Sequence, residues 1–101
     1  MDAVNLKDML RRVMDGYAGE GFNGHSYLTS SADGQVLAVV IVAQVRDQHI
    51  ADADLIARLV GDKIIIERDL NDKTLVDALV QAGVPRQQIV LAYAGESVEA
   101  A

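Results

Sequence analysis

The stretch GDKIIIERDLNDKTLVDALVQAGVPRQQIVLAY, residues 61–93, decides the fold of this chain. It opens with a two-residue turn at Gly61–Asp62, which leads into an apolar strand centred on Ile64–Ile66. A helix is predicted next, over Asn71–Ala82, because apolar residues recur there at three- and four-residue spacing. A strand followed directly by an amphipathic helix indicates a domain in which the helix packs on a sheet.

The two ends of this helix carry their own signals. Asn71 or Asp72 is the predicted N-cap, since both side chains can accept a hydrogen bond from the first helical turn. Gly83 stands where a left-handed residue ends a helix, and Pro85 follows where the helix cannot continue. A last short strand is predicted over Gln88–Tyr93, so the helix connects two strands.

A helix and a hairpin are predicted before this stretch. Residues 5–18 carry apolar side chains at helical spacing, and Asn5 is placed to cap their start. Residues 25–31 and 35–44 have the composition of two strands. Asp33–Gly34 lies between them and is typical of a hairpin turn, which needs positive φ angles.

Residues 49–60 fit either a short helix or a strand. We favour the strand, because Gly61–Asp62 then turns it directly into the next one. The strand over 35–44 is apolar on both faces, which predicts a central position with other elements packed on each side. The order of elements predicts one α+β domain over residues 1–101, in which two helices pack on a mostly antiparallel sheet of four to five strands. We expect residues 94–101 to form a flexible tail.

Composition and charge exclude several classes of function. The chain has no cysteine, which removes disulfides, thiol nucleophiles and thiolate metal sites. Its net charge is −6 with scattered basic residues, so we expect no tight binding of the isolated chain to DNA or to an anionic membrane. The longest apolar run, Val36–Ala43, has eight residues, whereas a membrane helix needs about twenty. These features suit a cytoplasmic protein.

No pattern indicates a catalytic, cofactor-binding or metal site. His25 and His49 lack the spacing of a metal pair, and we interpret them as residues at the starts of strands. The glycine-rich segment Gly16–Gly24 follows a helix and lacks the lysine of a phosphate-binding loop. We therefore predict no catalytic residue, no cofactor and no bound metal.

Two pairs of carboxylates are the remaining candidates. Asp52 and Asp54 alternate along a strand, as cation ligands can, but the glycine-containing calcium loop is absent. Glu67 and Asp69 end an apolar strand, as in some nucleases, without the lysine that this chemistry uses two residues after the acid. We interpret all four as solvated side chains that are free to meet a partner.

The series of elements over residues 61–93 resembles the XisI family, the fdxN-element excision controlling factors. The shared features are an apolar strand ending near an acid, a helix, the stop Ala82–Pro85 and the strand Ile89–Tyr93. The chain lacks the tryptophans of that family, which marks it as a divergent member. The resemblance implies a compact α+β domain and a role as accessory or controlling factor in programmed DNA excision, with a XisH-like endonuclease as partner. It assigns no catalytic residue.

Three hypotheses of function follow. The first, which we favour, is a non-enzymatic factor acting through a protein partner, with Asp52, Asp54, Glu67 and Asp69 as the candidate contacts. The second is a self-assembling homo-oligomeric module that uses an unpaired sheet edge. The third is a small hydrolytic enzyme that uses Glu67 and Asp69 together with a histidine.

Overall fold

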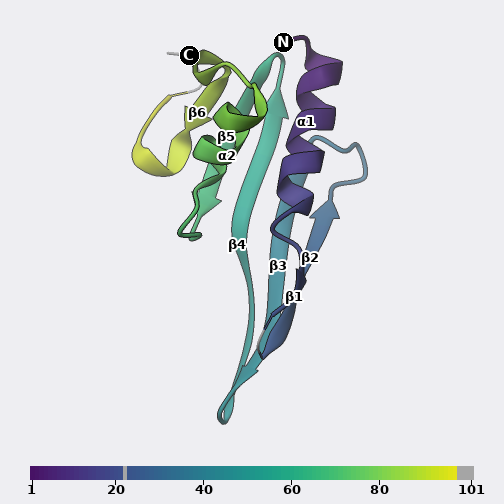
Figure 1. Cartoon of the computed structure of the whole chain (residues 1–101), viewed down its shortest axis with the longest axis vertical. Coiled ribbons are helices and arrows are strands. Elements are labelled where there is room, and N and C mark those ends of the chain that lie inside the picture. The colour runs from purple at the N-terminus through teal and green to yellow at the C-terminus, as the bar shows by residue number, and fades with distance from the viewer. Residues whose placement is uncertain (22, 98–101) are drawn as a thin grey trace.

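The computed structural model describes residues 1–21 and 23–97. Within them, helices α1 (Ala3–Asp15) and α2 (Leu75–Ala82) lie on one side of a six-stranded sheet (Figure 1). The strands are β1 (Gly19–Glu20), β2 (Gly24–Ser30), β3 (Val36–Val45), β4 (Gln48–Val60), β5 (Lys63–Asp69) and β6 (Ile89–Leu91). The predicted α+β class, with two helices packed on a mostly antiparallel sheet, is confirmed, and the sheet is slightly larger than predicted because the short β1 was missed.

The strands lie in the sheet in the order of the sequence. Neighbours from β1 to β5 are antiparallel, because tight turns connect them, and β6 alone runs parallel to its neighbour β5. Helix α2 and a 3-10 turn, η1 (Arg86–Gln88), supply the longer connection that parallel strands need. A second 3-10 turn, η2 (Ala92–Ala94), follows β6.

The turns fall where the sequence predicted them. Gly34, between β2 and β3, has φ 72°, and Gly61, between β4 and β5, has φ 59°. Residues 49–60 are therefore a strand, as favoured, since Gly61 turns β4 into β5. Gly83 has φ 110° and ends α2 in the left-handed conformation. Pro85 then leads into η1 rather than directly into the last strand, so β6 is shorter than predicted.

Both helices start at residues other than those predicted. Asp2, not Asn5, is the N-cap of α1, because Asp2 Oδ1 accepts the Asn5 backbone N–H at 2.8 Å. The helix consequently begins at Ala3 and ends at Asp15, before the predicted limit of residue 18. Helix α2 begins at Leu75, four residues after Asn71, because a carboxylate from the preceding strand binds its first free N–H group.

The core lies between the helices and one face of the sheet. Leu6, Leu10 and Met14 form the buried stripe of α1 at four-residue spacing. They meet Leu75 and Leu79 of α2 and the inward residues of the central strands in one cluster. The residues of this cluster that come from the sheet are Leu37, Val39, Leu55, Ala57, Leu59, Ile64, Ile66 and Ile89.

The opposite face of the sheet carries no helix among the described residues and stays partly exposed along β2, β3 and β4 (Figure 1). Ile65 and Val90, at the β5–β6 end of this face, are buried. The prediction that the strand over 35–44 is covered on each side was therefore wrong. Val36 and Val42 of β3 remain 38% and 37% exposed, although both alternate with core positions. This face of the strand is apolar, as the sequence indicated. The sequence could not show that no other part of the chain would cover Val36 and Val42.

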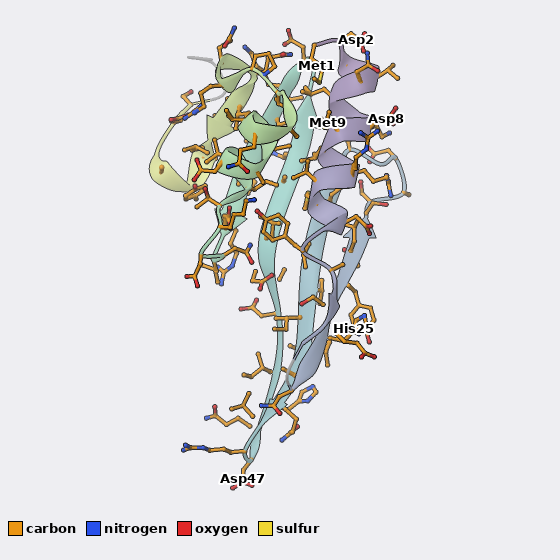
Figure 2. The ribbon with its side chains drawn as sticks, viewed as in Figure 1. Met1, Asp2, Asp8, Met9, His25 and Asp47 are labelled. Carbon is orange, nitrogen blue, oxygen red and sulfur yellow. The ribbon has the colours of Figure 1, made fainter. Side chains whose placement is uncertain are left out.

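The β3–β4 hairpin extends well beyond the two helices (Figure 1). It turns at Arg46–Asp47, where Arg46 adopts φ 55°. Figure 2 shows Asp47 at the tip of this arm and His25 on the strand beside it, both far from Asp8 on α1. Strand β5 pairs with β4 only between Leu55 and Val60, so the arm has a free edge along residues 48–53.

The expected tail falls partly on residues 98–101, which lie outside the described residues. Before them, the Glu96 carboxylate turns back toward the sheet. Its Oε1 accepts the Leu91 backbone N–H at 2.9 Å, and its Oε2 lies 3.1 Å from Arg86 Nη2. In the part of the chain that the structure describes, no helix is long and apolar enough to cross a membrane.

Candidate interaction surface

Asp69 is the residue that organises the start of α2. One carboxylate oxygen accepts the Leu75 backbone N–H at 2.6 Å, and the other accepts the Asn71 backbone and side-chain N–H groups at 3.0 and 2.9 Å. Thr74 occupies the N-cap position but makes no capping bond through its side chain. A negative charge at a helix N-terminus also meets the positive end of the helix dipole. Asp69 therefore has a structural role in addition to any role toward a partner.

The pairing of β4 with β5 brings the other three candidate carboxylates close to Asp69. Asp54 and Asp52 lie on β4 where β5 ends, because Leu55 pairs with Asp69 and the Leu70 N–H binds the Asp54 carbonyl at 3.0 Å. The Asp52 carboxylate lies 3.4 Å from Arg68 Nη2. All four sequence-predicted carboxylates thus sit around the end of β5.

Arginines neutralise two of these carboxylates. Arg68 pairs with Asp52, and Arg58 Nε lies 2.6 Å from Glu67 Oε2. Both pairs are well exposed, and such pairs contribute little to stability. Asp54 differs, because its Oδ1 is buried and has no hydrogen-bond partner among the described residues. The uncompensated negative charge at this end of the sheet therefore comes from Asp54 and Asp69.

This negative charge helps to raise the pKa of two tyrosines. Burial raises the pKa of Tyr17, and the nearby carboxylates of Asp69 and Asp77 raise it further. Burial, followed by Asp69, likewise raises the pKa of Tyr93. The Tyr17 hydroxyl donates to the Lys73 carbonyl at 2.8 Å, which fastens α1 to the segment before α2. We call Asp52, Asp54, Glu67, Asp69 and Asp77 together the acidic surface, in which Glu67 lies on the face of the sheet opposite to Asp69 and Asp77.

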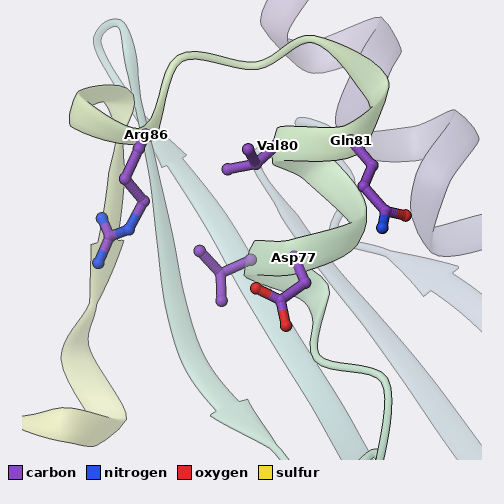
Figure 3. Close-up of a pocket in the computed structure, with 5 residues that line it drawn as sticks. Asp77, Val80, Gln81 and Arg86 are labelled. Atoms are coloured by element: carbon purple, nitrogen blue, oxygen red, sulfur yellow. The ribbon is translucent and has the colours of Figure 1, made fainter.

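An open cleft of about 420 Å³ adjoins the acidic surface along α2 (Figure 3). Asp77 and Val80 project from α2 toward Arg86, which lies across the cleft. Arg86 is held by the Ile89 carbonyl, 2.7 Å from Nη1, and by the Glu96 carboxylate. An apolar floor with one acid and one base at its rim suits contact with side chains of another protein.

The structure does not bring together Glu67, Asp69 and the two histidines, which the hypothesis of a hydrolytic enzyme requires. Glu67 contacts Arg58 on one side of the sheet, whereas Asp69 binds the start of α2 on the other. His25 packs beside Tyr27, with ring centroids 4.3 Å apart, and His49 lies opposite Gln44 on the arm. Over residues 1–21 and 23–97 no group of three or more histidines and carboxylates could hold a metal ion.

Sequence reasoning missed Tyr17 and Asp77 as parts of the acidic surface. Tyr17 falls within the helix predicted over residues 5–18. The available signal was its hydroxyl group, which usually finds a hydrogen-bond partner where a tyrosine is buried. Asp77 is the only charged residue within α2. The one charged residue of a mainly apolar helix was the available signal for a polar rim.

The fold and its surfaces define a small α+β protein with an acidic surface beside one helix. The family model described as XisI protein matches residues 6–100, and the chain belongs to this family. The resemblance found in residues 61–93 is thereby confirmed and extends over most of the chain. A search of curated proteins found no significant match.

Two solved structures share this fold. One is a XisI-like protein from Anabaena variabilis ATCC 29413, with a TM-score of 0.75 and 21% identity, covering 87% of this chain and 84% of that one. The other is the fdxN element excision controlling factor XisI from the same organism. It has a TM-score of 0.65 and 16% identity, covering 86% of this chain and 88% of that one.

Proposed function

We propose that this chain is a non-enzymatic controlling factor of DNA element excision that acts through a protein partner. The observation that carries the proposal is the XisI family match over residues 6–100. A protein of the same fold is described as an fdxN element excision controlling factor. The scattered positions of Glu67, Asp69 and the histidines support a controlling role rather than a catalytic one.

The charge of the chain supports a protein partner rather than DNA as the direct contact. A domain with a net charge of −6 gains little from the counterion release that drives DNA affinity. Two of its arginines, Arg58 and Arg68, are already paired with carboxylates. The acidic surface suits a basic partner, such as a XisH-like endonuclease, through charge complementarity. We further propose that the protein works in the cytoplasm.

The partner contact is tested by mixing the purified chain with a XisH-like endonuclease from the same genome and following association by stopped-flow fluorescence. The double variant Glu67→Gln, Asp69→Asn removes two charges and keeps an oxygen acceptor at each position. We expect association to slow several-fold and its dependence on salt to flatten. The matched control, Asp8→Asn with Asp15→Asn, removes two charges from the exposed side of α1 and leaves both quantities unchanged.

Three results count against this function. The first is that the α1 control slows association as much as the double variant does, which would mean that the effect depends only on net charge. The second is submicromolar binding of the isolated chain to duplex DNA at about 150 mM salt, where counterion release is already weakened. The third is metal-dependent nicking of DNA by the isolated chain, which would restore the hypothesis of a hydrolytic enzyme using Glu67 and Asp69.

The second candidate function, a self-assembling module, is favoured by the open face of the sheet. Exposed Val36 and Val42 stand on a strand whose alternate residues form the core. Self-assembly and control of excision are compatible if the partner contact centres on Asp69 and Asp77, because these two residues lie on the helical side of the sheet.

A further inference from the structure

The side of the sheet opposite α1 and α2, which we call the open face, is mainly apolar. Pairing defines its members, because residues directly opposite on neighbouring strands share a face and alternate residues change face. Tyr27 pairs with Val40, and Val36 and Ala38 alternate with the core residues of β3. The apolar residues of the open face include Tyr27, Val36, Ala38, Val40, Val42, Ile56 and Val60, together with the buried Ile65 and Val90.

Exposure on the open face is concentrated in large side chains. Tyr27 is 50% exposed, and Val36, Val42 and Val60 are each 37–38% exposed. They come from three adjacent strands, so they belong to one continuous surface rather than to isolated positions. Monomeric proteins rarely leave contiguous apolar patches of more than a few hundred Å² in water.

The open face carries little of the negative charge of the chain. Its basic side chains are Arg58, Lys63 and Arg68, and its acidic ones are Glu67, the ion-pair partner of Arg58, and Glu20, which lies beside His25 in the sheet. The face thus has three of the nine basic residues and two of the fifteen acids, for a net charge near +1 against −6 for the whole chain. Two copies that approach through this face avoid the repulsion that two copies of the acidic surface would meet.

The open face is also large enough for a stable interface. The molecule measures 44 × 27 × 25 Å, and the sheet spreads across the two longer directions, since Figure 1 looks along the shortest one. Because Ile65 and Val90 at one end of the face are buried, the area available along β2, β3 and β4 is several hundred Å², of the order of the roughly 800 Å² that a standard interface buries on each partner. The arm formed by β3 and β4 lengthens the face beyond what the two helices could cover.

We infer that the open face packs against the open face of a second copy of this chain, sheet on sheet. A two-fold arrangement uses the same surface on both copies, and a nearly neutral apolar sheet is self-complementary in this sense. Aligned packing of two sheets, about 10 Å apart, would bury Tyr27 and Val42 of both copies. A basic partner that binds around Asp69 and Asp77 lies on the helical side of the sheet, so its contact leaves the open face free. The inference holds whether or not the chain controls excision.

The mass of the protein in solution tests this inference, by light scattering after size exclusion and by sedimentation equilibrium. We expect a mass twice the 10.8 kDa of one chain at micromolar concentration. The variant Val36→Lys, Val42→Lys places four additional charges in the dimer interface, and we expect its dimer to dissociate at least tenfold more readily. The matched control is Val80→Lys, which changes a 44% exposed valine on α2 and leaves dimer affinity unchanged.

A labelling experiment keeps the test independent of those substitutions. Because the chain has no cysteine, Ala38→Cys introduces a single site for a nitroxide label at the open face. We expect a distance between the labels of two copies below about 30 Å, given sheets roughly 10 Å apart. A label at Arg11→Cys, on the exposed side of α1, reports a clearly longer distance.

The inference is overturned if the native chain stays monomeric up to about 100 µM. It is equally overturned if the Val36→Lys, Val42→Lys variant, shown by circular dichroism to be folded, dimerises as tightly as the native chain. Should this variant not fold, the labels decide: a shorter distance from Arg11 than from Ala38 would place the contact on the helical side and refute the inference.

Discussion

Replacing Leu79 by alanine measures how much the contact of α2 with the rest of the fold contributes to stability. Leu79 is 0% exposed and belongs to the cluster that joins α2 to α1 and the sheet. Fully burying a leucine side chain is worth about 1.5–3 kcal/mol, and the cavity left by truncation adds to this loss. Alanine has a higher helix propensity, but only by a few tenths of a kcal/mol. We therefore expect Leu79→Ala to lower the free energy of unfolding by about 3 kcal/mol, within a range of 2–5.

Urea denaturation followed by circular dichroism gives this difference from the shift in midpoint at constant slope. A loss of about 3 kcal/mol should also lower the melting temperature by more than about 10 °C for a chain of this size. Val80→Ala, at an exposed neighbouring position of the same helix, is the matched control and should cost less than about 1 kcal/mol. A loss below about 1 kcal/mol for Leu79→Ala, or equal losses for the two variants, would refute the assignment of this helix face to the core.

Three further changes test individual features. Gly83→Val should destabilise the protein by more than about 1 kcal/mol in urea melts, because φ 110° suits a β-branched residue poorly, and unchanged stability would contradict the left-handed helix end. Asp69→Ala should cost about 1–2 kcal/mol through the lost bond to Leu75, whereas a loss below about 0.5 kcal/mol would mean that the carboxylate does not cap α2. Tyr17 should titrate above the ordinary tyrosine pKa of about 10 in absorbance at 295 nm, and Asp77→Asn should lower that pKa. Its raised pKa contributes stability below pH 10 that is lost as the pH rises through the folded value, so an unshifted titration would contradict the structure.

The sequence determined the features that depend on neighbouring residues. Gly34, Gly61 and Gly83 mark turns and a helix end, because these positions need φ angles that other residues adopt at a cost. The spacing of apolar residues in α2 predicted a buried face of Leu75, Val76, Leu79 and Val80. Leu75 and Leu79 are buried, whereas the prediction was wrong for Val80, which lines the open cleft and is 44% exposed. The strand over residues 49–60 followed from the turn at Gly61, which left room for a hairpin. Local rules were sufficient for all of these except Val80.

The start of α2 was decided by the tertiary structure. Asn71 and Asp72 were the better caps by sequence position, yet Asp69 reaches Leu75 from the end of β5, six residues away in the chain. The competition between these side chains depends on where β5 ends beside β4. The same placement brought Asp52 and Asp54 to Asp69, which no spacing in the sequence indicates.

Only the tertiary structure could decide what covers the strand from Val36 to Val45. Its apolar residues on both faces predicted burial on both sides, and that much follows from the cost of leaving apolar surface in water. The hydrophobic effect is non-directional, so the sequence does not specify whether the covering atoms belong to the same chain or to another one. The helices are long enough to cover one face only, and their loops place both on the same side. The face opposite the helices is therefore open because of the connections between elements, whereas its apolar character follows from the sequence alone.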